Sequence, residues 1–257
     1  VYFVIYPRRL RNSLRFYHAV YPDRGRWFRL ARAWRQYKSF AALFAERLAL
    51  ERGGEIPFES EGWEHLERAH RDHTGGIIVM SHLGNWEVAA RLFQRRALRM
   101  MIYMGARQKE QLERQQKEDL QAERIKIVAV EAGGESMLGG LEGLKWVKEG
   151  GFVAMTGDML WTREQRALEV TFFGRPVRFP QAPFAFALLT RAPLFVFFSL
   201  RTRKRIYRIS ITPPRVLQAR RAGRQQAMQR AAQEYADLLE QKVREHPHQW
   251  YHFEPFF

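Results

Sequence analysis

Short apolar runs alternate along this chain with longer helical stretches, and this alternation constrains the fold more than any other feature. Buried strands are predicted at residues 77–80, 100–104, 125–130, 151–156, 194–200 and 206–211. Helices are predicted at residues 88–98, 109–124, 137–148 and 219–244. Strands that alternate with helices are typical of a sheet covered by helices. We therefore expect a single α/β domain, with a central mixed β-sheet flanked by helices.

Residues 1–52 have a different character, because arginines and aromatic rings are interleaved along a stretch of helical pattern. Such a segment suits the membrane interface, where rings lie at headgroup depth and arginines meet lipid phosphates. The alternative is a solvated helical hairpin whose aromatic rings pack on the domain. We expect a membrane-associating segment that forms one structural unit with the α/β domain at residues 53–257.

The net charge of +16, from 43 Lys and Arg against 27 Asp and Glu, implies an anionic partner. Nucleic acid, an anionic membrane surface and an acidic carrier protein all satisfy this requirement. Runs such as Phe195-Val196-Phe197-Phe198 favour an apolar wall over a base-stacking platform. The chain has no cysteine, which excludes disulfides, thiolate zinc sites and a cysteine nucleophile.

His82 and Glu87 are the first candidates for catalysis. Five positions along one helix would place them about 140° apart, so they meet only if His82 lies in a loop before the helix. The sequence favours this arrangement, since Gly84 permits a tight turn and Asn85 suits the helix N-cap. A carboxylate that holds one imidazole nitrogen leaves the other nitrogen as a general base. On residues alone, a structural histidine remains the more common interpretation.

Residues 81–87, Ser-His-Leu-Gly-Asn-Trp-Glu, resemble the His-x4-Asp/Glu motif of glycerolipid acyltransferases. Within that group the chain is most similar to the bacterial lipid A biosynthesis (lauroyl/myristoyl) acyltransferase family. The likeness continues, in order, through the segments 157–158, 172–176, 179–183, 190–193 and 246–251. It covers roughly residues 75–257, and such ordered co-occurrence is more specific than one motif.

The resemblance implies roles for several residues. His82 is the expected general base and Glu87 its orienting carboxylate. The family's downstream arginine corresponds to Arg124 or to Arg107, and it would bind phosphate or stabilise the oxyanion. Asp158 would line the site or support the base, although the chain has Gly-Asp where many relatives have Asp-Gln. The remaining substrate-binding candidates are Asn85, Phe173 and Arg175.

Other patterns carry weaker predictions. Phe172, Phe173 and Gly174 are either core aromatics before a turn or the wall of an acyl pocket. Residues 201–205 are interpreted as a basic hairpin tip that could dock an acidic carrier protein or lipid headgroups. The histidines of segment 246–252 are interpreted as packing in the C-terminal tail. Neither glycine-rich nucleotide motifs nor metal-ligand spacings are found, so we expect no metal and no cofactor.

Taken with the resemblance, the sequence predicts an acyltransferase that moves a fatty acyl chain from a thioester to a hydroxyl. The donor is acyl carrier protein or acyl-CoA, and the acceptor is a glycolipid or lipid A-type precursor. A lysophospholipid acceptor is the alternative, and a basic nucleic-acid- or lipid-binding protein without catalysis is the rival of another class. We expect no nucleic-acid partner. The expected location is the cytoplasmic face of the bacterial inner membrane, with peripheral attachment or a missing N-terminal anchor.

Overall fold

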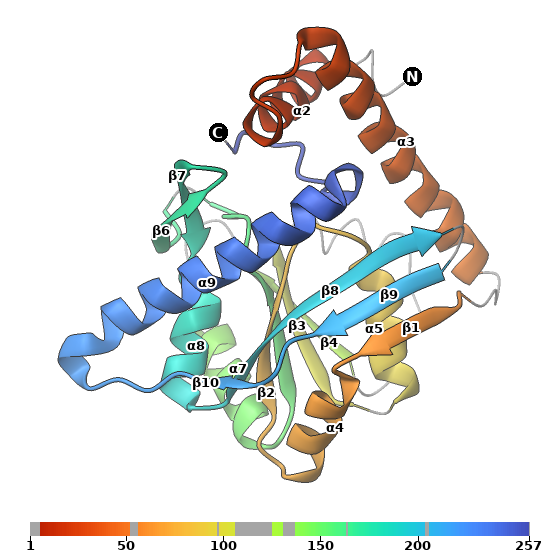
Figure 1. The fold of residues 1–257 in the computed structure, drawn as a ribbon. Coiled ribbons are helices and arrows are strands. Elements are labelled where there is room, and N and C mark those ends of the chain that lie inside the picture. The colour runs from red at the N-terminus through yellow and green to blue at the C-terminus, as the bar shows by residue number, and fades with distance from the viewer. Residues whose placement is uncertain are drawn as a thin grey trace.

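The computed structural model of the protein describes residues 6–51, 56–96, 98–105, 125–130, 137–162, 164–203 and 206–256. Within these residues, eight strands form one sheet and two form a separate hairpin (Figure 1). The strands are β1 (Phe58–Glu61), β2 (Gly76–Met80), β3 (Met100–Gly105), β4 (Ile125–Val130), β5 (Phe152–Thr156), β6 (Ala167–Phe172), β7 (Arg175–Pro180), β8 (Pro193–Arg203), β9 (Ile206–Ile211) and β10 (Arg215–Val216).

The main sheet is mixed, with the spatial order β1-β9-β8-β2-β5-β3-β4 and β10 paired to β8. Strands β8, β2, β5, β3 and β4 are parallel to their neighbours in this order, whereas β9 runs antiparallel to β8. The order differs from the chain order, because β5 lies between β2 and β3. The expected mixed sheet and its six predicted strands are confirmed.

Helices cover both faces of this sheet. They are α2 (Pro7–Val20), α3 (Arg26–Glu51), α4 (Trp63–Arg71), α5 (Trp86–Arg95), α7 (Met137–Lys148), α8 (Ala182–Thr190) and α9 (Arg224–Glu245). Short 3-10 turns occupy Arg221–Gly223 and Pro247–Gln249. Because successive strand residues point to opposite faces, Ile77 and Val79 of β2 join one apolar cluster with α8 and α9. Ile78 and Met80 join a second cluster, with α4 and α5.

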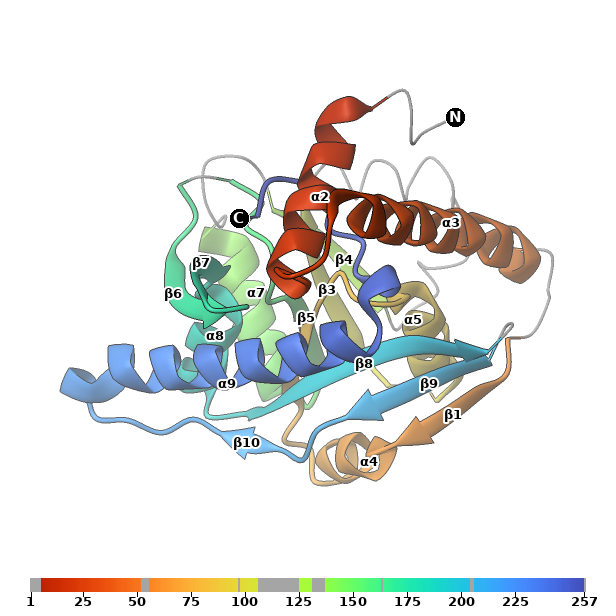
Figure 2. The ribbon, with the colours of Figure 1, turned by 45° about the horizontal axis from the view of Figure 1, so that its top comes forward.

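The N-terminal helices pack on the rest of the protein through aromatic residues. Phe16 and Tyr17 of α2 are buried, and the Tyr17 hydroxyl donates to the carbonyl of Pro247 at 3.0 Å. Gln36 of α3 donates to the carbonyl of Trp250 at 2.6 Å. Figure 2 shows both helices lying across one end of the molecule, beside the C-terminal tail. None of the described helices is both long and apolar enough to span a bilayer.

Some predictions are corrected or lie outside the described residues. The helix predicted at residues 109–124, including Arg124, and the rival residue Arg107 are outside them. Arg201 was expected at an exposed hairpin tip, but it belongs to strand β8, with its side chain 21% exposed and paired to an acidic residue. Strand β1, the β6–β7 hairpin and helix α8 were not predicted.

Candidate active site

Two polar residues meet where the parallel strands β2 and β5 end. Met80 and Thr156 are partners in the register of these strands, so His82 and Asp158 each lie two residues beyond the same edge. The carboxyl edge of a parallel sheet is the usual position of a functional site in this class of fold. Glycine is needed between Thr156 and Asp158, because a Cβ on Gly157 would overlap Val79 and the ring of Tyr235.

The carboxylate of Asp158 is completely buried and receives three hydrogen bonds. Its Oδ1 lies 2.9 Å from His82 Nδ1, and its Oδ2 accepts from the His82 backbone N–H at 2.8 Å. The same Oδ2 accepts from Trp250 Nε1 at 2.9 Å. The His82 side chain is 18% exposed. Asp158 therefore fixes both the backbone and the ring of His82, while the ring remains accessible to a substrate.

The electrostatics of this pair are those of a base held by a carboxylate. Burial alone would raise the pKa of Asp158, but the charge of His82 and the hydrogen bonds from His82 and Trp250 lower the pKa below its usual value. Burial would likewise lower the pKa of His82, but the Asp158 charge and hydrogen bond raise the pKa above the usual value. An ionised Asp158 requires the proton on Nδ1, which leaves the lone pair of Nε2 free to accept a proton.

The turn that carries His82 is fixed to its surroundings through its backbone. Gly84 N donates to the carbonyl of Gln249 at 2.8 Å, and Asn85 N donates to the carbonyl of Ser199 at 2.9 Å. Gly84 has φ +87°, and a Cβ there would lie 2.0 Å from the Ser199 carbonyl oxygen. Only glycine fits this close approach without strain. The expected tight turn at Gly84 is confirmed.

The C-terminal tail completes the site, beyond the packing role expected for it. Tyr251 N donates to the carbonyl of His82 at 2.9 Å, and the ring of His252 lies 5.8 Å from the ring of His82. Burial and the charge of His82 lower the pKa of His252 to about 4, so this second histidine is neutral. In contrast, His248 packs against Tyr17 as expected. The motif at residues 246–251 is evident in the sequence, but the contact of its Trp250 with Asp158 depends on tertiary structure.

Phe173 lies in a two-residue turn between β6 and β7. Phe172 pairs with Arg175 in the hairpin, and both loop residues have positive φ, 50° at Phe173 and 70° at Gly174. Phe173 is buried against Phe172 at a centroid distance of 4.7 Å. The ring of Phe172 in turn contacts Trp250 at 5.7 Å. The hairpin thus joins an aromatic wall next to the Asp158 carboxylate, whereas Arg175 is exposed at the start of β7.

Of the remaining predicted residues, some lie within the described part of the structure and others lie outside it. Asn85 is buried directly before α5, where its amide donates to the Tyr207 hydroxyl at 3.4 Å. Glu87 lies in the first turn of α5, as expected, but its side chain is outside the described part of the structure, so its pairing with His82 stays a prediction. Arg107 and Arg124 also stay predictions. Among described residues, no group of three or more His, Cys, Asp or Glu side chains is arranged to hold a metal.

Comparison with known proteins gives one family match. The family model described as bacterial lipid A biosynthesis acyltransferase matches residues 29–257, nearly the whole chain. A search of curated proteins gave no significant match.

Proposed function

Because the chain belongs to the bacterial lipid A biosynthesis acyltransferase family, we propose that it transfers a fatty acyl chain from a thioester donor to a hydroxyl of a lipid A-type precursor. The observation that carries the proposal is the hydrogen bond between His82 and the buried Asp158, at the carboxyl edge of the sheet. Family membership makes the protein an acyltransferase, and it disfavours the nucleic-acid-binding alternative. A lysophospholipid acceptor remains the alternative within the same chemistry.

The reaction proceeds by direct transfer. His82 Nε2 takes the proton of the acceptor hydroxyl as the hydroxyl oxygen attacks the thioester carbonyl carbon. The tetrahedral intermediate collapses with cleavage of the C–S bond, and the leaving thiolate receives the proton from His82. Asp158 keeps the proton on Nδ1 and stabilises the imidazolium that forms between the two steps, as a carboxylate does in a catalytic triad.

The carboxylate that orients His82 is assigned to Asp158 in this proposal. Nδ1 is occupied by Asp158, so a second carboxylate on the ring would have to bind Nε2, the atom needed as the base. Glu87 would then act nearby rather than as the partner of the ring. Comparison of Glu87→Ala with Asp158→Asn separates the two assignments, since the orienting residue is the one whose loss shifts the titration of His82.

The backbone N–H groups of the His82 turn do not stabilise the oxyanion. The N–H groups of His82, Leu83, Gly84 and Asn85 all have partners within the protein. The first N–H groups of a helix have no partner inside the helix, and they point toward developing negative charge at the helix N-terminus. We therefore assign the oxyanion to the first turn of α5, together with the arginine predicted at Arg124 or Arg107.

Membrane association is assigned to the outer face of α3. Trp27 and Trp34 are seven residues apart on this helix, and they are 81% and 49% exposed. Seven residues make two helical turns, so both rings lie on one face. The exposed cations Arg24, Arg35 and Lys38 lie nearby in the sequence. Such a face suits an anionic membrane surface, consistent with the cytoplasmic face of the inner membrane, and the basic chain suits an acidic acyl carrier protein or acyl-CoA as donor.

The test is acceptor-dependent release of free thiol from acyl carrier protein and acyl-CoA thioesters. Wild-type protein with a lipid A-type acceptor should release thiol, and the faster thioester identifies the donor. His82→Ala should abolish release, whereas His65→Ala, on α4 and away from the site, should not. Thiol release with lysophospholipid but not with the lipid A-type precursor would identify lysophospholipid as the acceptor. No thiol release from folded protein on liposomes would contradict the proposal.

A further inference from the structure

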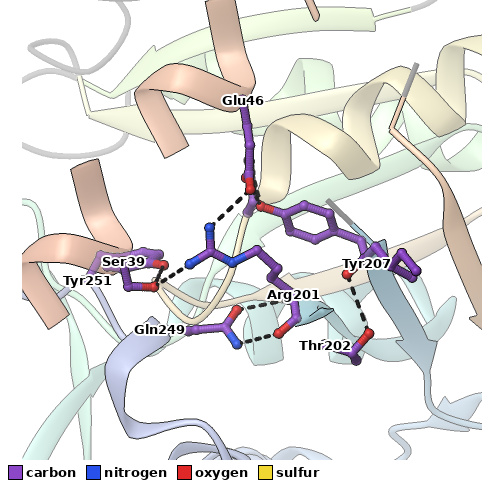
Figure 3. A network of polar contacts seen from close by, with 9 residues as sticks. Ser39, Glu46, Arg201, Thr202, Tyr207, Gln249 and Tyr251 are labelled. Atoms are coloured by element: carbon purple, nitrogen blue, oxygen red, sulfur yellow. Dashed lines mark hydrogen bonds and ion pairs between the residues drawn. The ribbon is translucent and has the colours of Figure 1, made fainter. Parts of the chain in front are cut away.

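A charged pair lies between α3 and β8, away from the atoms that react. The Arg201 guanidinium donates to Glu46 at 3.0 Å and to the Ser39 hydroxyl at 2.9 Å (Figure 3). The side chains of Arg201 and Glu46 are 21% and 7% exposed. Burying two charges is costly unless their geometry is well satisfied. The mechanism proposed above gives this pair no role, so its presence calls for an explanation.

Hydrogen bonds lead from this pair to both sides of the His82 turn. The Tyr207 hydroxyl donates to Glu46 and accepts from the side-chain amide of Asn85, the last residue of the turn. On the other side, Ser39 shares a hydrogen bond of 2.8 Å with the Tyr251 hydroxyl. Figure 3 shows Glu46 and Ser39 meeting the Arg201 guanidinium, with Tyr207 bonded to Glu46 and Tyr251 bonded to Ser39.

The backbone of Arg201 reaches the same turn by a second route. Gln249 accepts from Arg201 N at 2.8 Å and donates to Arg201 O at 2.7 Å through its side-chain amide. The carbonyl of Gln249 then accepts from Gly84 N. With the bond from Tyr251 N to the carbonyl of His82, three points of the turn are held by residues bonded to this network.

We propose that Arg201 and Glu46 are positioning residues, which hold the His82 turn against Asp158 and so make the reactivity of His82 depend on the seating of α3. This inference rests on the proposed function. Its physical basis is that charge-assisted hydrogen bonds fix direction as well as distance. A displacement of about 1 Å at a reacting group costs about 10²-fold in rate.

The first test is kinetic. Arg201→Gln and Glu46→Gln should each lower kcat by about 10²-fold and leave the KM for the thioester nearly unchanged, because alignment rather than binding is lost. Arg201→Lys should recover part of the rate, since it restores the charge but not the second bond to Ser39. Tyr207→Phe leaves no unpaired charge, so it should fold well and show a smaller loss in the same direction.

Two control variants separate positioning from general loss of stability. Arg208→Gln removes the exposed ion pair between Arg208 and Glu59, on the neighbouring strands β9 and β1. Leu66→Ala opens a cavity in fully buried α4 packing, on the opposite face of the sheet from α9. Both should retain wild-type kcat at a temperature where the protein is folded. If Leu66→Ala lowers kcat as much as Arg201→Gln at equal stability, the positioning role is refuted.

The deciding measurement follows the imidazole of His82 by NMR in ¹⁵N-histidine-labelled protein as pH is varied. Among the described residues, the titratable groups next to the ring are Asp158 after β5 and neutral His252 in the tail, and the Glu87 side chain lies outside that part of the structure. Arg201→Gln should loosen the Asp158 bond and lower the pKa of His82, whereas Leu66→Ala should not. An unchanged titration in Arg201→Gln overturns the inference. The NMR titration does not require enzymatic activity. It therefore still tests the positioning role if the wild-type protein transfers no acyl group, which would contradict the proposed function alone.

Discussion

Replacing Asp158 by Asn tests whether the carboxylate that holds the proton on His82 Nδ1 is required for catalysis. Among the described residues, Asp158 Oδ2 accepts from the His82 N–H and the Trp250 indole, whereas Oδ1 has the His82 ring as its partner. An amide NH₂ at the Oδ2 position would leave two buried donors without acceptors, at about 1–3 kcal/mol each. The introduced amide therefore turns its oxygen to these donors and its NH₂ to Nδ1 of the ring.

This orientation forces the wrong tautomer on His82. Nδ1 must accept a hydrogen bond from the NH₂, so the proton moves to Nε2, which can no longer act as a base. The corresponding change in a serine-protease triad lowers kcat by about 10⁴-fold, and we expect a loss of about 10³- to 10⁴-fold here. All three hydrogen bonds persist, but each changes from charge-assisted to neutral, so the free energy of unfolding should fall by about 1.5–3 kcal/mol.

Acceptor-dependent thiol release measures kcat, and urea unfolding followed by circular dichroism measures stability. Asp237→Asn on α9 is the matched control, because this carboxylate is exposed and its contact among the described residues is Gln233 of the same helix. The control should change neither quantity appreciably. Retention of more than a tenth of the wild-type kcat by Asp158→Asn would refute the role given to the carboxylate.

Three further predictions concern the surroundings of this pair. Gly84→Ala should destabilise the protein by about 3 kcal/mol or more in urea unfolding, because its φ is +87° and the new Cβ would meet the Ser199 carbonyl. Trp250→Phe removes one donor to buried Asp158 and should cost about 1.5–3 kcal/mol, with a fall in kcat measured by thiol release. Because the folded-state pKa of His252 is about 4, below the usual value of about 6.5, stability should fall by up to about 3 kcal/mol as pH decreases through this window. His252→Gln should reduce that loss in pH-dependent thermal melts, and an undiminished loss would contradict the assignment.

The elements that the sequence predicts well are those with a clear pattern. The apolar runs at residues 77–80 and 125–130 coincide with β2 and β4, and the C-terminal helix is α9, which begins at Arg224 after a 3-10 turn. Helix α8 has no polar side to give it a helical period, and most of its side chains are buried or half-buried between α9 and the sheet. The β6–β7 hairpin was missed because Phe173 occupies a positive-φ turn position where Asn or Gly is usual.

The sequence predicts which residues belong to the site better than it predicts the contacts between them. His82 was identified from the motif, and Asp158 was named as a possible support for the base. Their contact follows from β5 lying directly beside β2, a strand order that chain order does not give. The contribution of Trp250 required the tail to fold back over this edge. Arg201 looked like part of a solvated loop because its buried partner, Glu46, is distant in sequence.

The most direct test is to identify the product by mass spectrometry after incubation of a lipid A-type acceptor with an acyl thioester. Wild-type protein should produce an acceptor heavier by one ester-linked acyl chain, and His82→Ala, shown to be folded by circular dichroism, should produce none. Equal yields of acylated acceptor from both proteins would contradict a mechanism in which His82 is the base.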